Sequence, residues 1–386
     1  MTQHSKLQDL IDLFQRTLWL PDPGIVYVVL ATVAANLLGS PPVWLLVVGP
    51  PSSGKTECLD ALSGLRLCLD VSSFSEAGLL SGSAVRDGAG TGGLLMQLPD
   101  PGILVASDFG TLLNEHGSTR NRLFACLREV FDGKFIRRLG TNGGQEFGWW
   151  GHAGFIGACT EAIDSPSIDL GVLGERFVYY RLPETTPGDE FMASIVADET
   201  MGRVGEIREQ RAALVAEIIA DLVLPEAFPS IPEAHQERLV TLATIGAKCR
   251  SSVLREGYSR EIDLVPGHER SPRLYRQLRH LHAGLTVIGA PEDEAWRLVA
   301  KVALDGMHPG RRKVIEYLIA QPGDHATNAI AGHCRLPVTP TRRHLQDLNA
   351  HGVIDLAGEH PERWTASAWL RDNWWAVADI APVAAP

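Results

Sequence analysis

The chain has 386 residues, of which 45 % are hydrophobic, and a formal net charge of −11. This length allows two or three domains with cores of their own, and the negative charge argues against nucleic-acid binding over the whole surface while leaving room for a local basic patch. The six scattered cysteines show no metal-ligand spacing and are typical of a cytoplasmic protein with reduced thiols. Because the apolar runs are too short to span a bilayer, we expect no membrane contact.

The first 182 residues predict two helices followed by an α/β domain. Apolar residues recur at helical spacing from Leu7 to Leu18, and Ile25 to Leu38 forms an apolar helix after a proline-rich start. Short apolar runs then alternate with helical or polar segments: Val43 to Val48, Leu67 to Val71, Ile103 to Ala106, Phe155 to Cys159 and Phe177 to Leu182. Strands of this length separated by crossovers indicate a parallel sheet with helices on both faces.

The strand pattern stops after Pro183, and two further domains are predicted. Residues 189–305 have a helical pattern throughout. From Pro309 the pattern is three helices followed by a two-stranded hairpin, which is the winged-helix arrangement. We therefore expect N-terminal helices in residues 1–40, an α/β core in 41–185, a helical lid in 186–305, a winged helix in 306–376 and a tail in 377–386.

One loop matches a phosphate-binding motif. The segment Gly49-Pro50-Pro51-Ser52-Ser53-Gly54-Lys55-Thr56 fits G-x-x-x-x-G-K-[ST] and lies between a predicted strand and a predicted helix. Backbone N–H groups would hold the phosphates of ATP, Lys55 would neutralise the β- and γ-phosphate oxygens, and the Thr56 hydroxyl would bind Mg²⁺. We expect the residues from Gly49 to Glu57 to contact the nucleotide.

A site of this kind also needs an acid that orients magnesium, and Asp108 follows the predicted strand at Ile103 to Ala106. The next residue is Phe109, where many related enzymes carry a glutamate that polarises the attacking water. Either Asp108 binds magnesium, or Ser107 takes that position and Asp108 polarises the water. The carboxylates that could replace the glutamate are Glu76, Glu115, Glu129 and Glu161. Slow hydrolysis is a possible consequence of Phe109.

Two polar residues next to predicted strands are further candidates. Thr160 follows the run Phe155 to Cys159, where its hydroxyl could contact the γ-phosphate or the attacking water, or simply bond to the backbone. Arg176 precedes the last strand, where it could stabilise the transition state in a neighbouring subunit as an arginine finger, or form a surface salt bridge. The finger role requires an oligomer.

The order of these motifs resembles that of the AAA+ ATPases. The segments LREVFDG, KFIRRLGTNGGQEFGWW, GFIGACTEAID and LGERFVYYRL are similar to those of minichromosome-maintenance-like helicases and of AAA+ proteins from phages and mobile elements. The resemblance covers roughly residues 25–290. It implies a P-loop NTPase core with a helical lid, ATP and Mg²⁺ as cofactors, and a homo-oligomeric ring, expected to be a hexamer. In the segment SPRLYRQLRHL it implies that Arg273, or else Arg276, contacts the nucleotide of its own subunit.

A predicted β-hairpin could contact DNA. Lys134 to Leu139 and Gln145 to Trp150 flank a turn rich in Asn and Gly. In the pore of a ring, such a hairpin could contact a phosphate backbone through Lys134, Arg137 and Arg138. A purely structural hairpin is an equal alternative. We expect Trp149 and Trp150 to pack rather than to stack on bases.

The predicted winged helix is the second candidate for DNA binding. Arg342 and Arg343 lie in the first turn of its third helix, which enters the major groove when such modules bind DNA. Nearby acidic residues, however, make this surface only weakly basic. A contact with another protein subunit is the alternative.

These patterns favour a ring-forming, ATP-driven DNA translocase or helicase that serves replication of a phage or mobile element. The alternative is a nucleotide-gated loader or regulator that assembles on ATP binding and hydrolyses ATP slowly, and Phe109 favours it. A small-molecule kinase would also use the phosphate loop, but it has no role for a helical lid and a winged helix.

Overall fold

The computed structural model describes residues 3–73, 75–80, 93–138, 146–165, 175–258, 260–359 and 361–378. These residues divide into two units, which are described separately. Among them, unit 1 consists of the chain up to Pro229 together with His280–Leu298, and unit 2 consists of Ser230–Arg279 and the chain from Val299 on. The segment predicted as a helical lid, 186–305, is therefore divided between the two units. No helix within the described ranges has both the length and the apolar character needed to cross a membrane.

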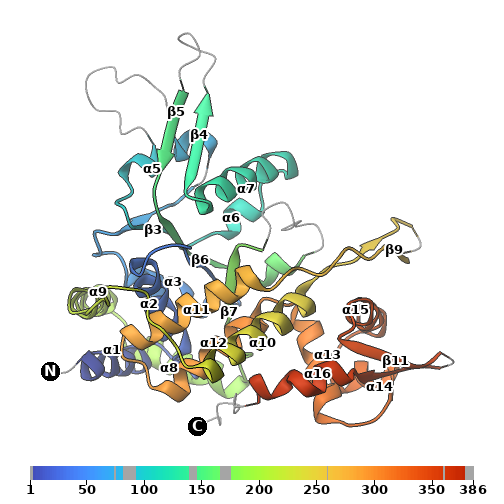
Figure 1. Ribbon diagram of the computed structural model, residues 1–386. Coiled ribbons are helices and arrows are strands. Elements are labelled where there is room, and N and C mark those ends of the chain that lie inside the picture. Colours follow the sequence, from blue (N-terminus) through green and yellow to red (C-terminus); the bar gives the residue numbers. More distant parts are fainter. Residues whose placement is uncertain are drawn as a thin grey trace. The chain divides into compact units, whose positions relative to one another are not determined.

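Unit 1 is built on a five-stranded parallel sheet with the order β2-β3-β6-β1-β7 (Figure 1). The strands are β1 (Trp44–Val48), β2 (Cys68–Asp70), β3 (Gly102–Ala106), β6 (Ala153–Cys159) and β7 (Phe177–Arg181). Every residue of β1, β3 and β6 is buried, because helices cover both faces of the sheet. Each strand coincides with a predicted apolar run, and the prediction of a parallel α/β sheet is confirmed.

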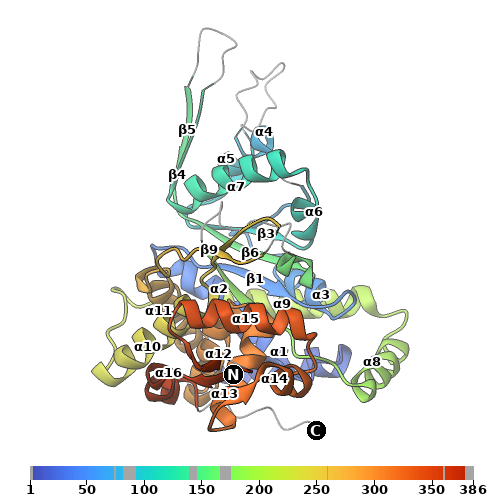
Figure 2. The ribbon, with the colours of Figure 1, turned by 90° about the vertical axis from the view of Figure 1, so that its right-hand side faces the viewer.

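Helices pack on both faces of this sheet. On one face, α2 (Gly24–Leu37) contacts β1, β3 and β6. The other face is covered by α7 (Gly117–Phe131) (Figure 2). The Phe131 ring of this helix lies edge-on to Trp44, with the ring centroids 5.2 Å apart. The remaining helical elements with residues in unit 1 are α1 (Gln3–Thr17), α3 (Lys55–Asp60), α4 (Glu76–Leu79), α5 (Leu94–Gln97), α6 (Gly110–Leu113), η1 (Glu161–Asp164), α8 (Pro187–Glu199), α9 (Val204–Ala220) and parts of α11 (Pro272–Val287) and α12 (Glu292–Asp305).

The predicted hairpin is present in unit 1 as the antiparallel strands β4 (Lys134–Arg138) and β5 (Glu146–Trp150), which extend away from the sheet (Figures 1 and 2). Residues 139–145 lie outside the described part of the chain. Trp149 is buried, as expected. The expectation that Trp150 also packs is wrong, because 61 % of its surface is exposed.

Unit 2 contains α10 (Glu233–Arg250) and a group of C-terminal elements. These are α13 (Pro309–Ala320), β10 (His325–Ala326), α14 (Thr327–His333), α15 (Val338–Ala350), β11 (Ile354–Glu359), β12 (Glu362–Ala366), α16 (Ala368–Asn373) and η3 (Trp374–Ala376). The order of three helices and a hairpin matches the predicted elements, and β10 adds a third strand in the order β10-β12-β11.

A small hairpin in unit 2 corrects the expectation that residues 189–305 are helical throughout. It consists of β8 (Leu254–Arg255) and β9 (Ile262–Leu264). Arg255 donates to Asp347 of α15 at 2.5 Å, and Arg311 of α13 donates to the other carboxylate oxygen at 2.8 Å. In β9, Ile262 and Leu264 alternate with one polar residue over only three positions. A strand pattern this short cannot be recognised in the sequence between two long helices.

Asp22, in the link between α1 and α2, ties three parts of unit 1 together. Its carboxylate is buried and accepts hydrogen bonds from the Tyr180 hydroxyl at 2.9 Å, the Gly24 N–H at 2.9 Å and Arg297 of α12 at 2.8 Å. Burial alone would raise the pKa of Asp22, but the hydrogen bond and charge of Arg297, with the other two donors, outweigh it and leave the pKa lowered. The ionised carboxylate therefore stabilises the fold.

Replacing Asp22 by alanine should lower the stability of the protein by about 3 kcal/mol, because it removes one member of a buried ion pair. The lowered pKa means that this contribution is present above the unfolded-state pKa of about 3.9 and is lost as the pH falls through the folded-state value. Thermal unfolding at pH 7 should show a lower midpoint for Asp22→Ala than for Asp9→Ala, which removes an exposed acid of α1. Equal midpoints for the two variants would contradict this role.

Candidate nucleotide-binding site

The carboxyl ends of four strands meet where the phosphate loop begins. Val48, the last residue of β1, pairs with Cys159 of β6 on one side and with Arg181 of β7 on the other. β3 lies beside β6, with Ala106 paired to Gly157. Thr160 and Asp108, which follow β6 and β3, therefore lie at the same edge of the sheet as the loop. Ligands of parallel α/β sheets bind at this edge.

The phosphate loop connects β1 to α3, and its shape depends on Gly54. This residue has φ +82°, in the left-handed region where a side chain is strained. A Cβ at this position would also lie 2.7 Å from a methyl group of Leu18. The loop therefore turns tightly into the first residue of α3, which is Lys55.

The ammonium group of Lys55 is buried inside the loop. Its Nζ donates to the carbonyl oxygens of Gly49 at 2.8 Å and Pro50 at 2.5 Å, and to the Ser53 hydroxyl at 3.0 Å. Burial lowers the pKa of Lys55, and the charge of Glu161 acts against that shift. All three acceptors are neutral, so phosphate oxygens could replace them with stronger, charge-assisted hydrogen bonds.

The residues that follow β3 point in different directions. Asp108 is exposed and Ser107 is half-buried. Phe109 is fully buried, with its ring centroid 5.5 Å from that of Phe155 and 5.6 Å from that of Phe177. Position 109 therefore belongs to the core, and any water-activating carboxylate must come from elsewhere.

Of the four carboxylates considered as replacements, Glu161 follows directly after Thr160 at the edge of the sheet where the loop lies. Its charge acts to raise the pKa of Lys55. Glu76 instead forms an ion pair with Arg137 at 3.4 Å. Burial raises the pKa of the Cys159 thiol to about 12, and the charges of both Lys55 and Asp108 also act on this thiol. The structure thus brings Lys55, Asp108 and Glu161 into electrostatic reach of the end of β6.

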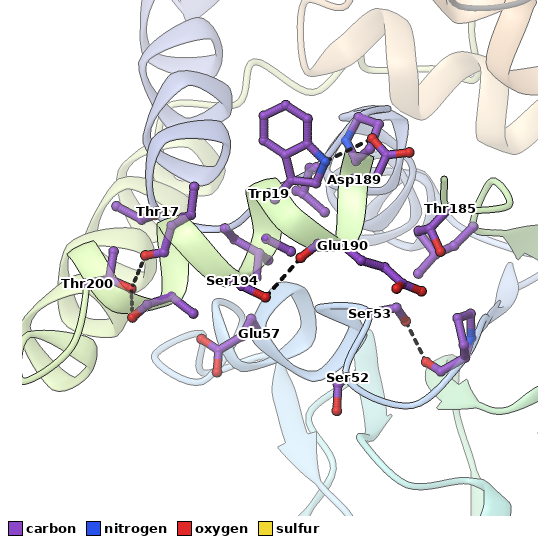
Figure 3. A pocket seen from close by; sticks show the side chains of 18 of the residues that line it. Thr17, Trp19, Ser52, Ser53, Glu57, Thr185, Asp189, Glu190, Ser194 and Thr200 are labelled. Atoms are coloured by element: carbon purple, nitrogen blue, oxygen red, sulfur yellow. Dashed lines mark hydrogen bonds between the residues drawn. The ribbon is translucent and has the colours of Figure 1, made fainter. Parts of the chain in front are cut away.

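A cavity of about 630 Å³ adjoins the phosphate loop (Figure 3). Its size lies within the range of about 300–1,000 Å³ that is common for small-molecule sites. The link between α1 and α2, the loop, the segment after β7, α8 and α9 all contribute to its walls, including Thr17, Trp19, Pro51, Ser53, Glu57, Leu182, Thr185, Asp189, Ser194, Val196, Ile207 and Arg211. A nucleoside in this cavity would place its phosphates on the loop.

Two long-range contacts hold the walls of this cavity. The Trp19 indole N–H donates to Asp189 of α8 at 3.0 Å, and Asp189 also caps its own helix through Thr186 (Figure 3). These hydrogen bonds, with those from Thr186 the largest, lower the pKa of Asp189. Asp189 therefore fixes the start of α8 and the Trp19 ring together.

The second contact ties α9 to the phosphate-loop helix through Arg211. Its side chain is 2 % exposed, pairs with Glu57 at 3.0 Å and donates to the Thr17 hydroxyl at 2.7 Å. Glu57 also pairs with Arg208 at 2.5 Å. The hydrogen bond from Arg208 is the largest of the effects that lower the pKa of Glu57. Glu57 thus lines the cavity with its negative charge neutralised by Arg208 and Arg211.

The proposed finger residue, Arg176, is paired within its own chain. It is 8 % exposed, contacts the Asp132 carboxylate at 3.0 Å and lies 5.4 Å from the ring centroid of Phe131. To act in a neighbouring subunit, it would have to leave Asp132. Arg273 and Arg276 are exposed on α11 in unit 2, whereas the phosphate loop belongs to unit 1.

Some of the side chains predicted to contact DNA are exposed, and others are bonded within the chain. On the hairpin, Lys134 is exposed, whereas Arg137 donates to the Leu80 carbonyl at 2.9 Å. The side chain of Arg138 lies outside the described part of the structure. On α15, Arg342 pairs with Glu362 at 3.0 Å, and Arg343 is exposed.

Sequence reasoning found the loop and the strand ends but missed the cavity walls. Trp19, Asp189 and Arg211 match no motif. The capping sequence that begins at Thr186 marks the start of α8 and could have located the helix. Nothing in the local pattern places that helix against Trp19, which lies 170 residues away.

The chain was compared with protein families, curated proteins and solved structures. No protein-family model matches the chain, and no curated protein matches it. Among solved structures, one described as a "putative ATPase" from Cytophaga hutchinsonii aligns over 79 % of this chain and 86 % of its own, with 11 % identity and a TM-score of 0.46. This likeness is too weak to establish a fold or an activity.

Lys55→Ala should weaken nucleotide binding about 10- to 100-fold, because the phosphates lose a charged hydrogen-bond donor. Titration with a fluorescent ATP analogue in the presence of Mg²⁺ would measure the change. Lys6→Ala, which removes a lysine paired with Asp221 on the surface, is the matched control and should bind like the parent protein. Unchanged affinity of Lys55→Ala would show that the loop does not hold the phosphates.

Proposed function

We propose that this chain is an ATP-dependent DNA translocase or helicase of the AAA+ type, which acts as a ring of identical subunits, expected to be six, in replication of a phage or mobile element. The observation that carries the ATPase part is the phosphate loop around Lys55, with an adjoining cavity and with acids at the same sheet edge. The DNA part rests on the basic hairpin and on the C-terminal group of helices and strands in unit 2.

The donors at the site suit magnesium. Thr56 and Asp108 offer a hydroxyl and a carboxylate, the hard oxygen ligands that Mg²⁺ prefers. When bound, Mg²⁺ would neutralise charge on the phosphate oxygens. Lys55 would release the loop carbonyls and bind the β- and γ-phosphates.

Hydrolysis requires a water that attacks the γ-phosphorus as ADP leaves. In our proposal Glu161 accepts the proton of that water while Asp108 binds magnesium, or Asp108 accepts the proton while Ser107 takes the magnesium position. Thr160 orients the water in either case. Position 109, where a water-activating glutamate is expected, holds a buried phenylalanine, so another carboxylate must accept the proton. A general base of this kind contributes about 10²- to 10⁴-fold to the rate.

Two segments extend the proposal beyond the core. We assign α8 and α9, which line the cavity, to a lid over the nucleotide. We assign α13, α14, α15 and the β11–β12 hairpin to a winged helix. Gln346 and Asp347 of α15 accept hydrogen bonds from Arg255 of β8. Because α15 begins at Val338, Arg342 and Arg343 lie in its second turn and not in the first turn, as the sequence predicted. DNA contacts would therefore fall to the exposed Arg343.

A second function is favoured by two observations. Phe109 occupies the core, and Arg176 is bound to Asp132. Both are compatible with a nucleotide-gated loader or regulator that assembles with ATP and hydrolyses it slowly. Such a protein would bind nucleotide as tightly as a motor but would show little turnover.

Turnover with and without single-stranded DNA separates the two functions. A translocase should hydrolyse ATP faster with DNA and displace a strand from a forked duplex, and Arg176→Ala should lose on the order of 10³-fold in turnover while keeping nucleotide affinity. Arg203→Ala, which removes an exposed arginine paired with Glu206, serves as the control. Negligible turnover with intact nucleotide binding would favour the regulator, and normal turnover of Arg176→Ala would exclude the finger role.

Neutral variants of the two acids identify the water-activating group. If Asp108 accepts the proton, the Asp108→Asn variant should lose at least about 10²-fold in turnover, and if Glu161 accepts it, the Glu161→Gln variant should show that loss. Both variants should keep the nucleotide affinity of the parent protein. Glu115→Gln is the matched comparison, since that residue is an exposed acid two residues beyond the end of α6. If both variants turned over at the parent rate, neither acid would be the base.

A further inference from the structure

The outward face of the β4–β5 hairpin carries a large aromatic ring that ATP hydrolysis does not explain. Successive residues of a strand point to opposite faces. Phe135 and Trp149 are directly opposite each other and both are buried. Lys134 and Trp150, the next pair in the register, therefore face outward, and Trp150 is 61 % exposed.

Gly148 holds the Trp150 ring against the strand. A Cβ built on Gly148 would lie 2.1 Å from Cη2 and 2.4 Å from Cζ3 of the Trp150 indole. Real side chains do not approach so closely, so the ring occupies the space that any other residue at position 148 would fill. The far end of the indole thus lies against the glycine backbone, while 61 % of the surface of Trp150 stays exposed.

A cation lies next to this ring. Lys134 is paired with Trp150 in the register and is exposed, and directly opposite residues of an antiparallel pair have Cβ atoms about 4.5–5.5 Å apart. The ammonium group can therefore reach a ligand that stacks on the indole. An ordered aromatic face beside a positive charge binds a base and its phosphate.

The surroundings of Trp150 favour a flat polar ligand over a protein. Anchor residues in protein interfaces lie within larger apolar patches that exclude water. Among the described side chains on this face of the hairpin, those of Lys134 and Glu146 are charged and exposed, Gly148 has none, and Ile136 is apolar and half-buried. A lone exposed indole among these described residues matches a single unpaired base.

We propose that Trp150 and Lys134 form a stacking site for an unpaired base of a single-stranded nucleic acid. The inference rests on the proposed function for the presence of such a strand, and it names the strand form and the contact. Trp150 stacks on the base, Lys134 contacts the adjacent phosphate, and Gly148 positions the ring.

Binding of the full chain to a fluorescein-labelled 20-mer of thymidine, followed by anisotropy, tests this site. Trp150→Ala should weaken binding about 5- to 150-fold, the loss of one stacked base. Trp150→Phe should retain most of the affinity, and Gly148→Ala should weaken it although the tryptophan remains. Trp375→Ala, at an exposed tryptophan of η3, which lies outside the elements assigned to the winged helix, is the matched control and should bind like the parent chain.

Two further readouts keep the result unambiguous. Each variant should bind a fluorescent ATP analogue like the parent chain, so that loss of the stacking site is distinguished from failure of the ATPase proposal. Ultraviolet crosslinking of the parent chain to an oligonucleotide with 5-bromouracil should label residue 150, which requires no variant to fold. The inference is wrong if the parent chain binds no 20-mer, if Trp150→Ala binds it equally well, or if that variant changes only self-association measured by light scattering.

Discussion

The ammonium of Lys55 is held by the carbonyl groups of the loop that carries it, and the arrangement of the candidate site follows from this interaction. A buried cation needs acceptors, and the loop supplies them because Gly54 allows the chain to fold back before α3 begins. The loop starts at the end of β1, between β6 and β7, so the residues after β6 and β3 stand beside it. Triphosphate binding would exchange neutral acceptors for charged ones without moving the scaffold.

The same site contains a conflict between binding and hydrolysis. The cavity, Lys55 and the Glu57–Arg211 contact support nucleotide binding. The usual position of the water-activating acid is instead filled by Phe109, which packs between two other rings of the core. Asp108 and Glu161 can compensate only if one of them reaches the attacking water. In the proposed function, the choice between motor and switch depends on which carboxylate does so and on whether Arg176 leaves Asp132.

The sequence predicts features that depend on near neighbours in the chain. The strands β1, β3 and β6 are recognisable as apolar runs because both faces of the sheet are covered there. The phosphate loop is recognisable because its spacing reflects local backbone geometry. Contacts between distant segments were not predictable. Trp19 meets Asp189, and Glu57 meets Arg211, only after the chain has folded. The position of Trp150 was likewise hidden, since its ring occupies the space that a side chain at position 148 would fill.

A structure of the full chain with a non-hydrolysable ATP analogue and Mg²⁺ tests the central claim most directly. We expect the Lys55 ammonium to leave the carbonyls of Gly49 and Pro50 and to contact the β- and γ-phosphates, with the base in the cavity beside Trp19. A nucleotide bound elsewhere, or a Lys55 side chain that keeps its bonds to the loop while nucleotide is present, would contradict the account.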